Sequence, residues 1–238
     1  MTPFGPQLYL PVGKFGAGRE PAEGWMARPS RKVVEPAGDV RGRLLAGAAG
    51  LFASKGYAAT TVREIVDRAG VTKPVLYYYF RSKEGIYLEM MREPLERFAA
   101  LLDAATAEEG SARERIARLC VRAYEVFVEH LEPARVMFAI YYGPPQGAPF
   151  VDFDAFHLRF QDAVHKLLED GIRRREFRKG NARDMMWAVI GAVNVAMELE
   201  LCRPRQSIGR GGTERMLGIL FDGIALGKDG AKGRGKGR

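Results

Sequence analysis

Apolar residues recur at three- and four-residue steps along most of this chain, and no stretch shows the alternation of valine, isoleucine and threonine that is typical of a strand. With 238 residues, of which 47% are hydrophobic, the chain is long enough to bury a sizeable core. The pattern predicts an all-α fold of about nine helices. Their expected ranges are 39–56, 61–70, 72–80, 82–107, 111–130, 132–142, 154–175, 182–201 and 213–226.

Both ends of the chain differ in composition from the helical part. Residues 1–38 contain six prolines and six glycines without sustained periodicity, which predicts a disordered extension. Residues 228–238 alternate glycine with lysine or arginine, which predicts a disordered basic tail. Between these ends we expect two domains, over residues 39–92 and 93–227.

The formal net charge of +8 is unevenly distributed. Residues 39–92 carry nine basic and five acidic groups, and residues 228–238 carry five and one, whereas residues 93–227 carry 18 and 20. A discrete basic segment is typical of a surface that meets a polyanion, either a nucleic acid or a membrane. The longest apolar stretch, Met185–Val193, is shorter than the roughly 18 to 20 residues of a spanning helix, so we expect no membrane partner.

Motifs for catalysis, metal binding and export are absent from the sequence. There is no phosphate-binding loop, no Gly-x-Ser-x-Gly and no His-Glu-x-x-His, so we expect neither an enzyme nor a cofactor. His157 and His165 lack close zinc spacing and a cysteine pair, so we expect no metal site. Two cysteines cannot form a framework of disulfides and nothing resembles a signal peptide, which together indicate a cytoplasmic protein.

Two short predicted helices are separated by a tight turn at Gly70. The first begins at Thr61, which forms a capping-box pattern with Glu64. The second begins at Thr72, whose hydroxyl is expected to cap it, and has Pro74 in its first turn, where proline is tolerated. This arrangement matches a helix-turn-helix, whose second helix lies in the major groove of DNA.

The second of these helices has an unusual surface. Tyr77, Tyr78 and Tyr79 are consecutive and cannot all be core, whereas Leu76 and Phe80 can turn inward. The tyrosine hydroxyls and the nearby Lys73 suit contacts with nucleic acid.

Residues 40–90 contain a series of short motifs in a fixed order, namely Leu51-Phe52-Ala53-Ser54-Lys55-Gly56-Tyr57, Thr60-Thr61-Val62-Arg63-Glu64-Ile65, Ala69-Gly70-Val71, Leu76-Tyr77-Tyr78-Tyr79-Phe80 and Ser82-Lys83-Glu84. In these motifs the segment resembles the TetR family of bacterial transcriptional regulators. The resemblance implies an N-terminal three-helix DNA-binding domain, a C-terminal helical domain for ligand binding and dimerisation, and a homodimer.

The resemblance also implies which residues contact DNA. It directs one set of side chains toward base edges, namely Thr72, Lys73, Pro74, Val75 and Tyr78. It directs a second set toward backbone phosphates, namely Thr61, Tyr77, Tyr79 and Lys83. Arg63 is added to the phosphate set. For Lys73, Arg63 and Lys83 the alternative is an ordinary solvated surface charge.

Two residues in the fourth predicted helix stand out. Pro94 is expected to kink or break it. The family often has a larger residue where this chain has Gly85, and glycine lowers helix stability by about 1 kcal/mol relative to alanine.

The C-terminal domain is rich in large apolar residues at helical spacing, which serve as core or as the lining of a ligand pocket. A small apolar or aromatic effector is expected. The pocket candidates are Tyr124, Phe127, Phe138, Tyr141, Phe156, Phe160 and Trp187.

The resemblance places the dimer interface on the last two helices, where two helices from each subunit form a four-helix bundle. The alternative is that these residues belong to the chain's own core. The candidates are Met185, Ala188, Val189, Ala192, Val193, Ala196, Leu217, Leu220 and Phe221.

Together these features favour a sequence-specific transcriptional regulator, namely a repressor that binds a palindromic DNA operator as a homodimer and is released by its effector. An activator, a ligand-independent family member and a DNA-binding protein without sequence preference are the alternatives. The effector, the operator, the regulated genes and the role of residues 1–38 are left open by the sequence.

Overall fold

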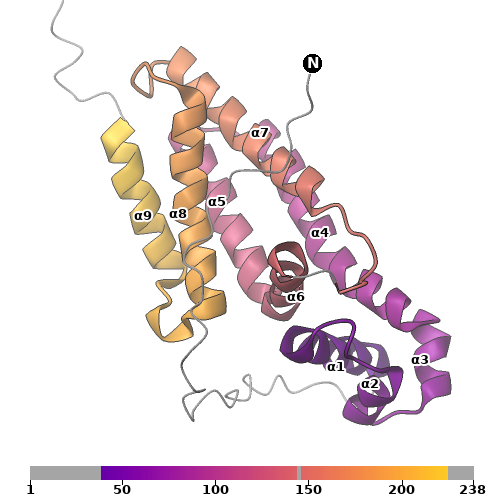
Figure 1. Cartoon of the computed structure of the whole chain (residues 1–238). Helices are drawn as coiled ribbons and strands as arrows, with labels where there is room; N and C mark the ends of the chain where they lie inside the picture. The colour runs from indigo at the N-terminus through magenta and orange to yellow at the C-terminus, as the bar shows by residue number, and fades with distance from the viewer. Residues whose placement is uncertain (1–38, 144–145, 225–238) are drawn as a thin grey trace, which may run out of the picture. The chain divides into compact units, whose positions relative to one another are not determined.

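The computed structural model describes residues 39–143 and 146–224, and this part of the chain is all-α, as predicted (Figure 1). Its elements are α1 (Val40–Lys55), α2 (Val62–Ala69), α3 (Lys73–Phe80), α4 (Lys83–Ala107), α5 (Ala112–Glu129), α6 (Leu131–Tyr142), α7 (Phe153–Arg173), α8 (Ala182–Cys202), a 3-10 turn (Pro204–Gln206) and α9 (Gly209–Ile224). The predicted disordered extension and basic tail, residues 1–38 and 228–238, lie outside the described residues.

The last helix begins four residues earlier than its predicted start at Thr213. Glycine disfavours a helix, so Gly209, Gly211 and Gly212 weaken the helical pattern over its first turn. In the structure the Thr213 hydroxyl donates to the Gly209 carbonyl at 3.0 Å. A Cβ at Gly212 would lie 2.4 Å from Cβ of Ile208, so a small residue is required there.

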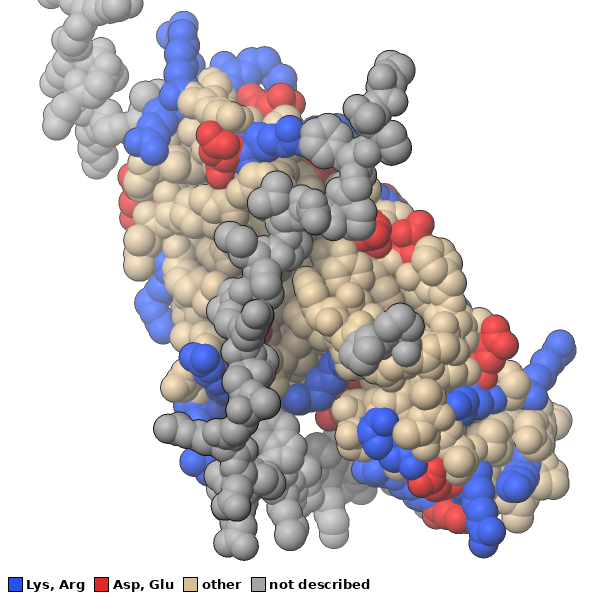
Figure 2. Space-filling model, in the orientation of Figure 1, with Lys and Arg blue, Asp and Glu red and all other residues tan. Residues whose placement is uncertain are grey.

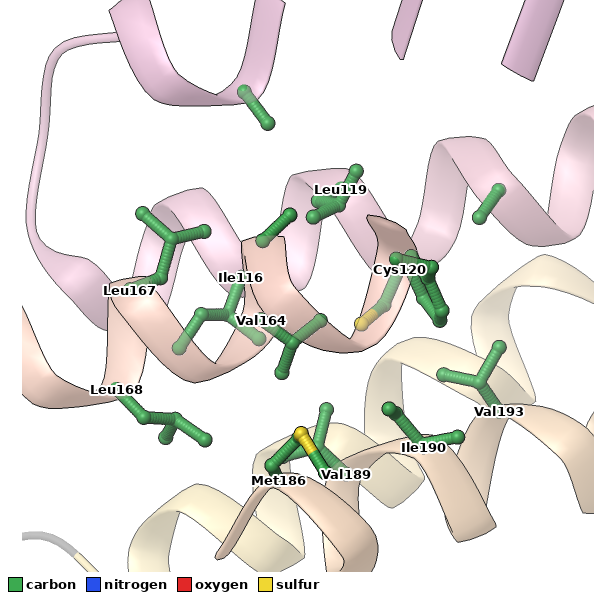
Figure 3. Close-up of a cluster of buried hydrophobic side chains, with 14 of the residues drawn as sticks. Ile116, Leu119, Cys120, Val164, Leu167, Leu168, Met186, Val189, Ile190 and Val193 are labelled. Carbon is green, nitrogen blue, oxygen red and sulfur yellow. The ribbon is translucent and has the colours of Figure 1, made fainter. Parts of the chain in front are cut away.

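The helices bury two hydrophobic clusters. The cluster we call the head core combines α1, α2, α3 and the first half of α4, with Leu44, Ile65 and Leu76 fully buried. The cluster we call the body core combines the second half of α4 with α5, α7, α8 and α9. Figure 3 shows part of the body core, in which side chains of three helices converge. They are Ile116, Leu119 and Cys120 of α5, Val164, Leu167 and Leu168 of α7, and Met186, Val189, Ile190 and Val193 of α8.

A single helix, α4, runs through both clusters, so the predicted domain boundary at residues 92 and 93 falls inside it. Pro94 lies between the head residue Met91 and the body residue Phe98. Proline removes one backbone hydrogen bond from a helix interior, yet α4 continues past Pro94 without a break. On its exposed side, Arg92 pairs with Glu89 at 2.7 Å and with Glu96 at 2.9 Å, and so links the turns on either side of the proline.

The head core also contains residues from far along the chain. Val136 of α6 is 1% exposed and Phe153, at the start of α7, is 5% exposed, and both belong to the head core. Met137 and Ile140 of α6 pack against the same cluster. The three N-terminal helices are therefore completed by α6 and by the start of α7.

By length and composition alone, α8 is apolar enough to cross a membrane. One face of α8 lies in the body core instead, as Met185, Val189 and Val193 show with exposed fractions of 7%, 0% and 0%. A core helix of a soluble protein passes the same test, so α8 is weak evidence for a membrane span.

Candidate nucleic-acid interface and effector region

The capping box at the start of α2 is confirmed. The Thr61 hydroxyl accepts a hydrogen bond from the Glu64 backbone N–H at 3.3 Å, and the Glu64 carboxylate accepts one from the Thr61 N–H at 2.9 Å. Lys55 donates to the other carboxylate oxygen at 2.5 Å. These bonds, from Lys55 first and then Thr61, lower the pKa of Glu64 to about 2. Gly70, with φ of 66°, ends the helix as predicted.

The predicted side-chain cap of α3 is wrong. Thr72 occupies the cap position, but its hydroxyl makes no capping hydrogen bond. A capping oxygen bonds the N–H of the second or third helical residue. Here the second residue is Pro74, which has no N–H, and the N–H of the third, Val75, donates to the Thr72 carbonyl at 3.0 Å. The exposed Thr72 hydroxyl therefore stays available for another partner.

The two faces of α3 differ as the sequence predicted. Leu76 is fully buried and Phe80 is 6% exposed, and both belong to the head core. On the outer face Tyr77, Tyr78 and Tyr79 are 47%, 82% and 43% exposed. The outer face also includes the exposed Lys73 and Pro74, whereas Val75 is half-buried against the head core.

Lys83 has an internal role that the sequence did not reveal. Its ammonium donates to the carbonyls of Tyr57 and Thr60 at 2.9 and 3.0 Å and lies 4.1 Å from the Tyr57 ring centroid. Burial lowers its pKa. Two of its three donors are therefore occupied by backbone carbonyls.

Arg63, the remaining member of the predicted DNA-contacting set, is exposed on α2 and pairs with Asp67 at 3.7 Å. Figure 2 shows basic side chains over the region of α1 to α3, with acidic ones beside them. The surface charge over α1 to α3 is therefore predominantly positive, with acidic groups interspersed.

Five of the seven effector-pocket candidates lie in one continuous series of ring contacts. From α5 to α6, Phe127 contacts Phe138, with centroids 6.2 Å apart, and Phe138 contacts Tyr142 at 5.4 Å. The series passes through Tyr141 to the ring of His157 on α7, with centroids 4.9 and 5.8 Å apart. It ends in the rings of Phe156, Phe98 and Phe160. We call these eight residues the aromatic series.

The other two pocket candidates lie elsewhere. Tyr124 is buried, and its hydroxyl donates to the Glu200 carboxylate, which also accepts from Ser207. Burial and this bond raise the pKa of Tyr124 to about 12. Tyr124 therefore ties α5 to the end of α8, a role that the sequence did not reveal because its partners are distant. Trp187 is 42% exposed on α8.

A surface depression of about 390 Å³ also lies between α7 and α8. None of the seven pocket candidates lines it. Its lining residues are Leu158, Gln161, Asp162, His165, Arg183 and Met186.

Six of the nine dimer-interface candidates lie inside the chain's own hydrophobic core. These are Met185, Val189, Val193, Ala196, Leu217 and Phe221. Ala188 is exposed, and Ala192 and Leu220 are half-buried. The same helices expose apolar residues that the sequence did not single out, including Val195 at 49% and Ile219 at 75%.

The turn between α1 and α2 contacts the segment that follows α6. The Tyr57 backbone N–H donates to Oε1 of Gln146 at 2.9 Å. At the preceding residue, Gly56, φ is 84°, and a Cβ would lie 2.5 Å from the same oxygen. The Tyr57 carbonyl accepts from Lys83. The backbone of Tyr57 is therefore bonded on both sides, through its N–H to the segment after α6 and through its carbonyl to α4.

No group of three metal-ligating side chains comes together in the described part of the chain. His157 Nδ1 lies 2.7 Å from the Phe153 carbonyl and His165 Nδ1 lies 3.8 Å from Glu169. The two histidines therefore have separate partners.

The known proteins that this chain resembles are transcriptional regulators. A family model described as bacterial regulatory proteins, tetR family, matches residues 44–90. The chain is 38% identical over 95 residues to the HTH-type transcriptional activator FasR of Mycolicibacterium smegmatis, covering 40% of this chain and 43% of that protein. It is 31% identical over 155 residues to the HTH-type transcriptional repressor KstR2 of the same organism, covering 63% of this chain and 73% of that protein.

Among solved structures, the TetR family transcriptional regulator PfmR from Thermus thermophilus is similar, with 25% identity and a TM-score of 0.61. That match covers 79% of this chain and 98% of PfmR. The likeness therefore extends beyond the first four helices to the helical body.

The lowered pKa of Glu64 predicts a pH-dependent contribution to stability. Unfolding returns the carboxyl to about its ordinary value of 4.5, so the unfolded chain binds more protons as pH falls toward 2. The contribution of Glu64 is present above that range and is lost as pH falls through it. In Glu64→Gln, which keeps a capping-box side chain, we expect a weaker decline of the unfolding free energy over this range, measured by urea unfolding. An equal decline in both proteins would contradict the assignment.

Proposed function

The chain belongs to the tetR family of bacterial regulatory proteins, and from this premise we propose that it is a ligand-responsive repressor that binds a palindromic operator as a cytoplasmic homodimer. It is a DNA-binding transcriptional regulator. The observation that carries the proposal is the division of α3, which buries Leu76 and Phe80 and exposes Tyr77, Tyr78 and Tyr79.

The outer face of α3 suits the major groove. Lys73 offers a donor for guanine acceptors, and the exposed Pro74 ring offers an apolar contact for a thymine methyl. Tyr78, the most exposed of the tyrosines, offers a hydroxyl that donates or accepts. Thr72 adds a second uncommitted hydroxyl at the start of the helix. We assign these residues to base edges and Tyr77 and Tyr79 to phosphates.

Repression is favoured by the relative that aligns over the greater length, since KstR2 is named a repressor. FasR is named an activator, and its match covers 43% of its length. Activation is therefore the second candidate function, and the position of the operator relative to the promoter distinguishes the two.

A small apolar or aromatic effector is supported by the aromatic series. Its half-buried members Phe127, Phe138 and Phe156 come from α5, α6 and α7, so a ligand bound against neighbouring rings of the series would contact more than one of these helices. Of these helices, α6 also packs Val136 into the head core. An effector that favours one position of α6 thereby favours one arrangement of the head, which is a population shift.

Dimerisation is assigned to the exposed faces of α8 and α9. The apolar residues there, Trp187, Val195 and Ile219, are free of the body core, and the small residues Ala188 and Gly191 lie beside them on α8 and permit close helix approach. Two subunits joined in this way present two copies of α3 to successive major grooves, about 34 to 36 Å apart.

Selection of bound duplexes from a random DNA pool, at roughly 150 mM salt to suppress phosphate-only binding, is expected to enrich a palindrome. With that operator, Lys73→Ala and Tyr78→Ala are each expected to lower affinity about 10-fold or more, because each removes a base contact. Lys166→Ala, an exposed lysine on α7, is the control and keeps full affinity. Failure to enrich any sequence would contradict the proposed function.

Ile219→Asp is expected to yield a monomer by sedimentation velocity, because it places a carboxylate in an apolar interface. Leu88→Asp, on an exposed position of α4, is the matched control and stays dimeric. A dimeric Ile219→Asp protein would place the interface elsewhere.

Gln146→Ala is expected to weaken the effect of an effector on operator binding, because it releases the Tyr57 N–H from the body. Amide hydrogen exchange at Tyr57 should rise in the variant even without an effector. The effector response is measured with apolar compounds screened against the operator complex. Gln206→Ala, on the exposed turn before α9, is the control. Unchanged exchange at Tyr57 would contradict a role for Gln146 in linking the effector to operator binding.

A further inference from the structure

The corner between α3 and α4 contains two residues that are locally unfavourable, Arg81 for its backbone conformation and Gly85 for its low helix propensity. Arg81 has φ of 64° and ψ of −30°, in a region that side-chain-bearing residues rarely adopt. Gly85 occupies the first turn of α4, where most residues favour a helix more strongly. Departures of this kind persist only where the surrounding structure requires them.

Arg81 and Gly85 both allow the end of α3 to lie close against the first turn of α4. The Ser82 N–H donates to the Phe80 carbonyl at 2.7 Å, which folds the chain sharply around Arg81. The carbonyl of Phe80, the last residue of α3, thereby lies against the first turn of α4. A Cβ at Gly85 would lie 1.9 Å from this oxygen, whereas such contacts are essentially never shorter than 3.0 Å. Glycine is therefore the residue that permits this approach.

Neither helix is free to move away from the other. Leu76 and Phe80 anchor α3 in the head core, and Ile86 and Tyr87, both fully buried, anchor the start of α4 in the same cluster. The obstructing atom is a backbone carbonyl and not the end of a flexible side chain. An added methyl group at position 85 must therefore displace α3, with its exposed side chains, relative to α4.

We propose that Gly85 and Arg81 form a positioning corner that sets the placement of the recognition helix α3 on α4. Position 85 then governs operator recognition without contacting DNA. The inference rests on the proposed function of α3. Recognition geometry must be held within about 0.5 Å, whereas lengthening the contact from 1.9 Å to 3.0 Å exceeds that tolerance. Contacts of lysine and arginine with phosphates tolerate the change, since they depend chiefly on charge.

The first test is Gly85→Ala, compared with Gly47→Ala in α1, where a Cβ would make only ordinary contacts at 3.7 Å. Helix propensity alone favours alanine at both positions. We expect Gly85→Ala to lower affinity for the selected operator about 10-fold or more, and to leave binding to unrelated duplex DNA at low salt within about twofold. Gly47→Ala keeps wild-type values. Wild-type operator affinity in Gly85→Ala would overturn the proposal.

A second pair of variants tests the positioning corner if Gly85→Ala does not fold. Arg81→Gly and Arg81→Val lose the same charge, but glycine adopts positive φ readily and a β-branched residue does not. We expect Arg81→Gly to bind the operator at least about 10-fold more tightly than Arg81→Val, and equal affinities would overturn the proposal. If the wild-type protein itself selects no operator, the proposed function fails instead, and the two failures are thereby distinguished.

Discussion

The head core is completed by side chains of α6 and of the start of α7. The apolar faces of α1, α2 and α3 need cover beyond what these helices give one another, and Val136 and Phe153, which follow α3 at a distance in the sequence, contribute to it. Because close-packed side chains do not deform continuously, a displacement of α6 must be accommodated inside the head. The turn at Tyr57, bonded to Gln146 and to Lys83, adds a second connection. The proposed effector region is therefore connected to the head core by direct packing of α6.

Local signals in the sequence predicted the fold and much of the candidate interface. Thr61 and Glu64 lie three residues apart and Gly70 has to adopt a positive φ, so these features depend on neighbours in the sequence. The exposure of tyrosines on α3 was predictable because a short helix buries one face, and three consecutive residues cannot all lie on that face. The early start of α9 was missed because its first turn is rich in glycine, which disfavours a helix. The missing cap at Thr72 was not predicted because Pro74 lacks the N–H that a capping hydroxyl would bond.

Contacts between distant residues could not be predicted in this way. Tyr124 matched an apolar stripe, but its hydroxyl meets Glu200, which no local pattern indicates. The dimer candidates included core residues for a related reason. Because α8 has apolar residues on more than one face, its periodicity does not reveal which face the chain buries itself. Val195 and Ile219 are recognisable as surface residues only once the body core is known.

The structure also divides the proposed DNA-contacting residues by what they do within the chain. Thr61 and Lys83 are already bonded to Glu64 and to two backbone carbonyls, so they hold the framework of the head. Lys73 and Tyr78 make no side-chain hydrogen bond within the described part of the chain and are exposed. On the proposed function, a substitution in the first group is expected to change stability together with DNA affinity, and one in the second group to change affinity alone. The side chains to which we assign sequence recognition therefore contribute little to the fold, and they lie on a helix whose position the rest of the head determines.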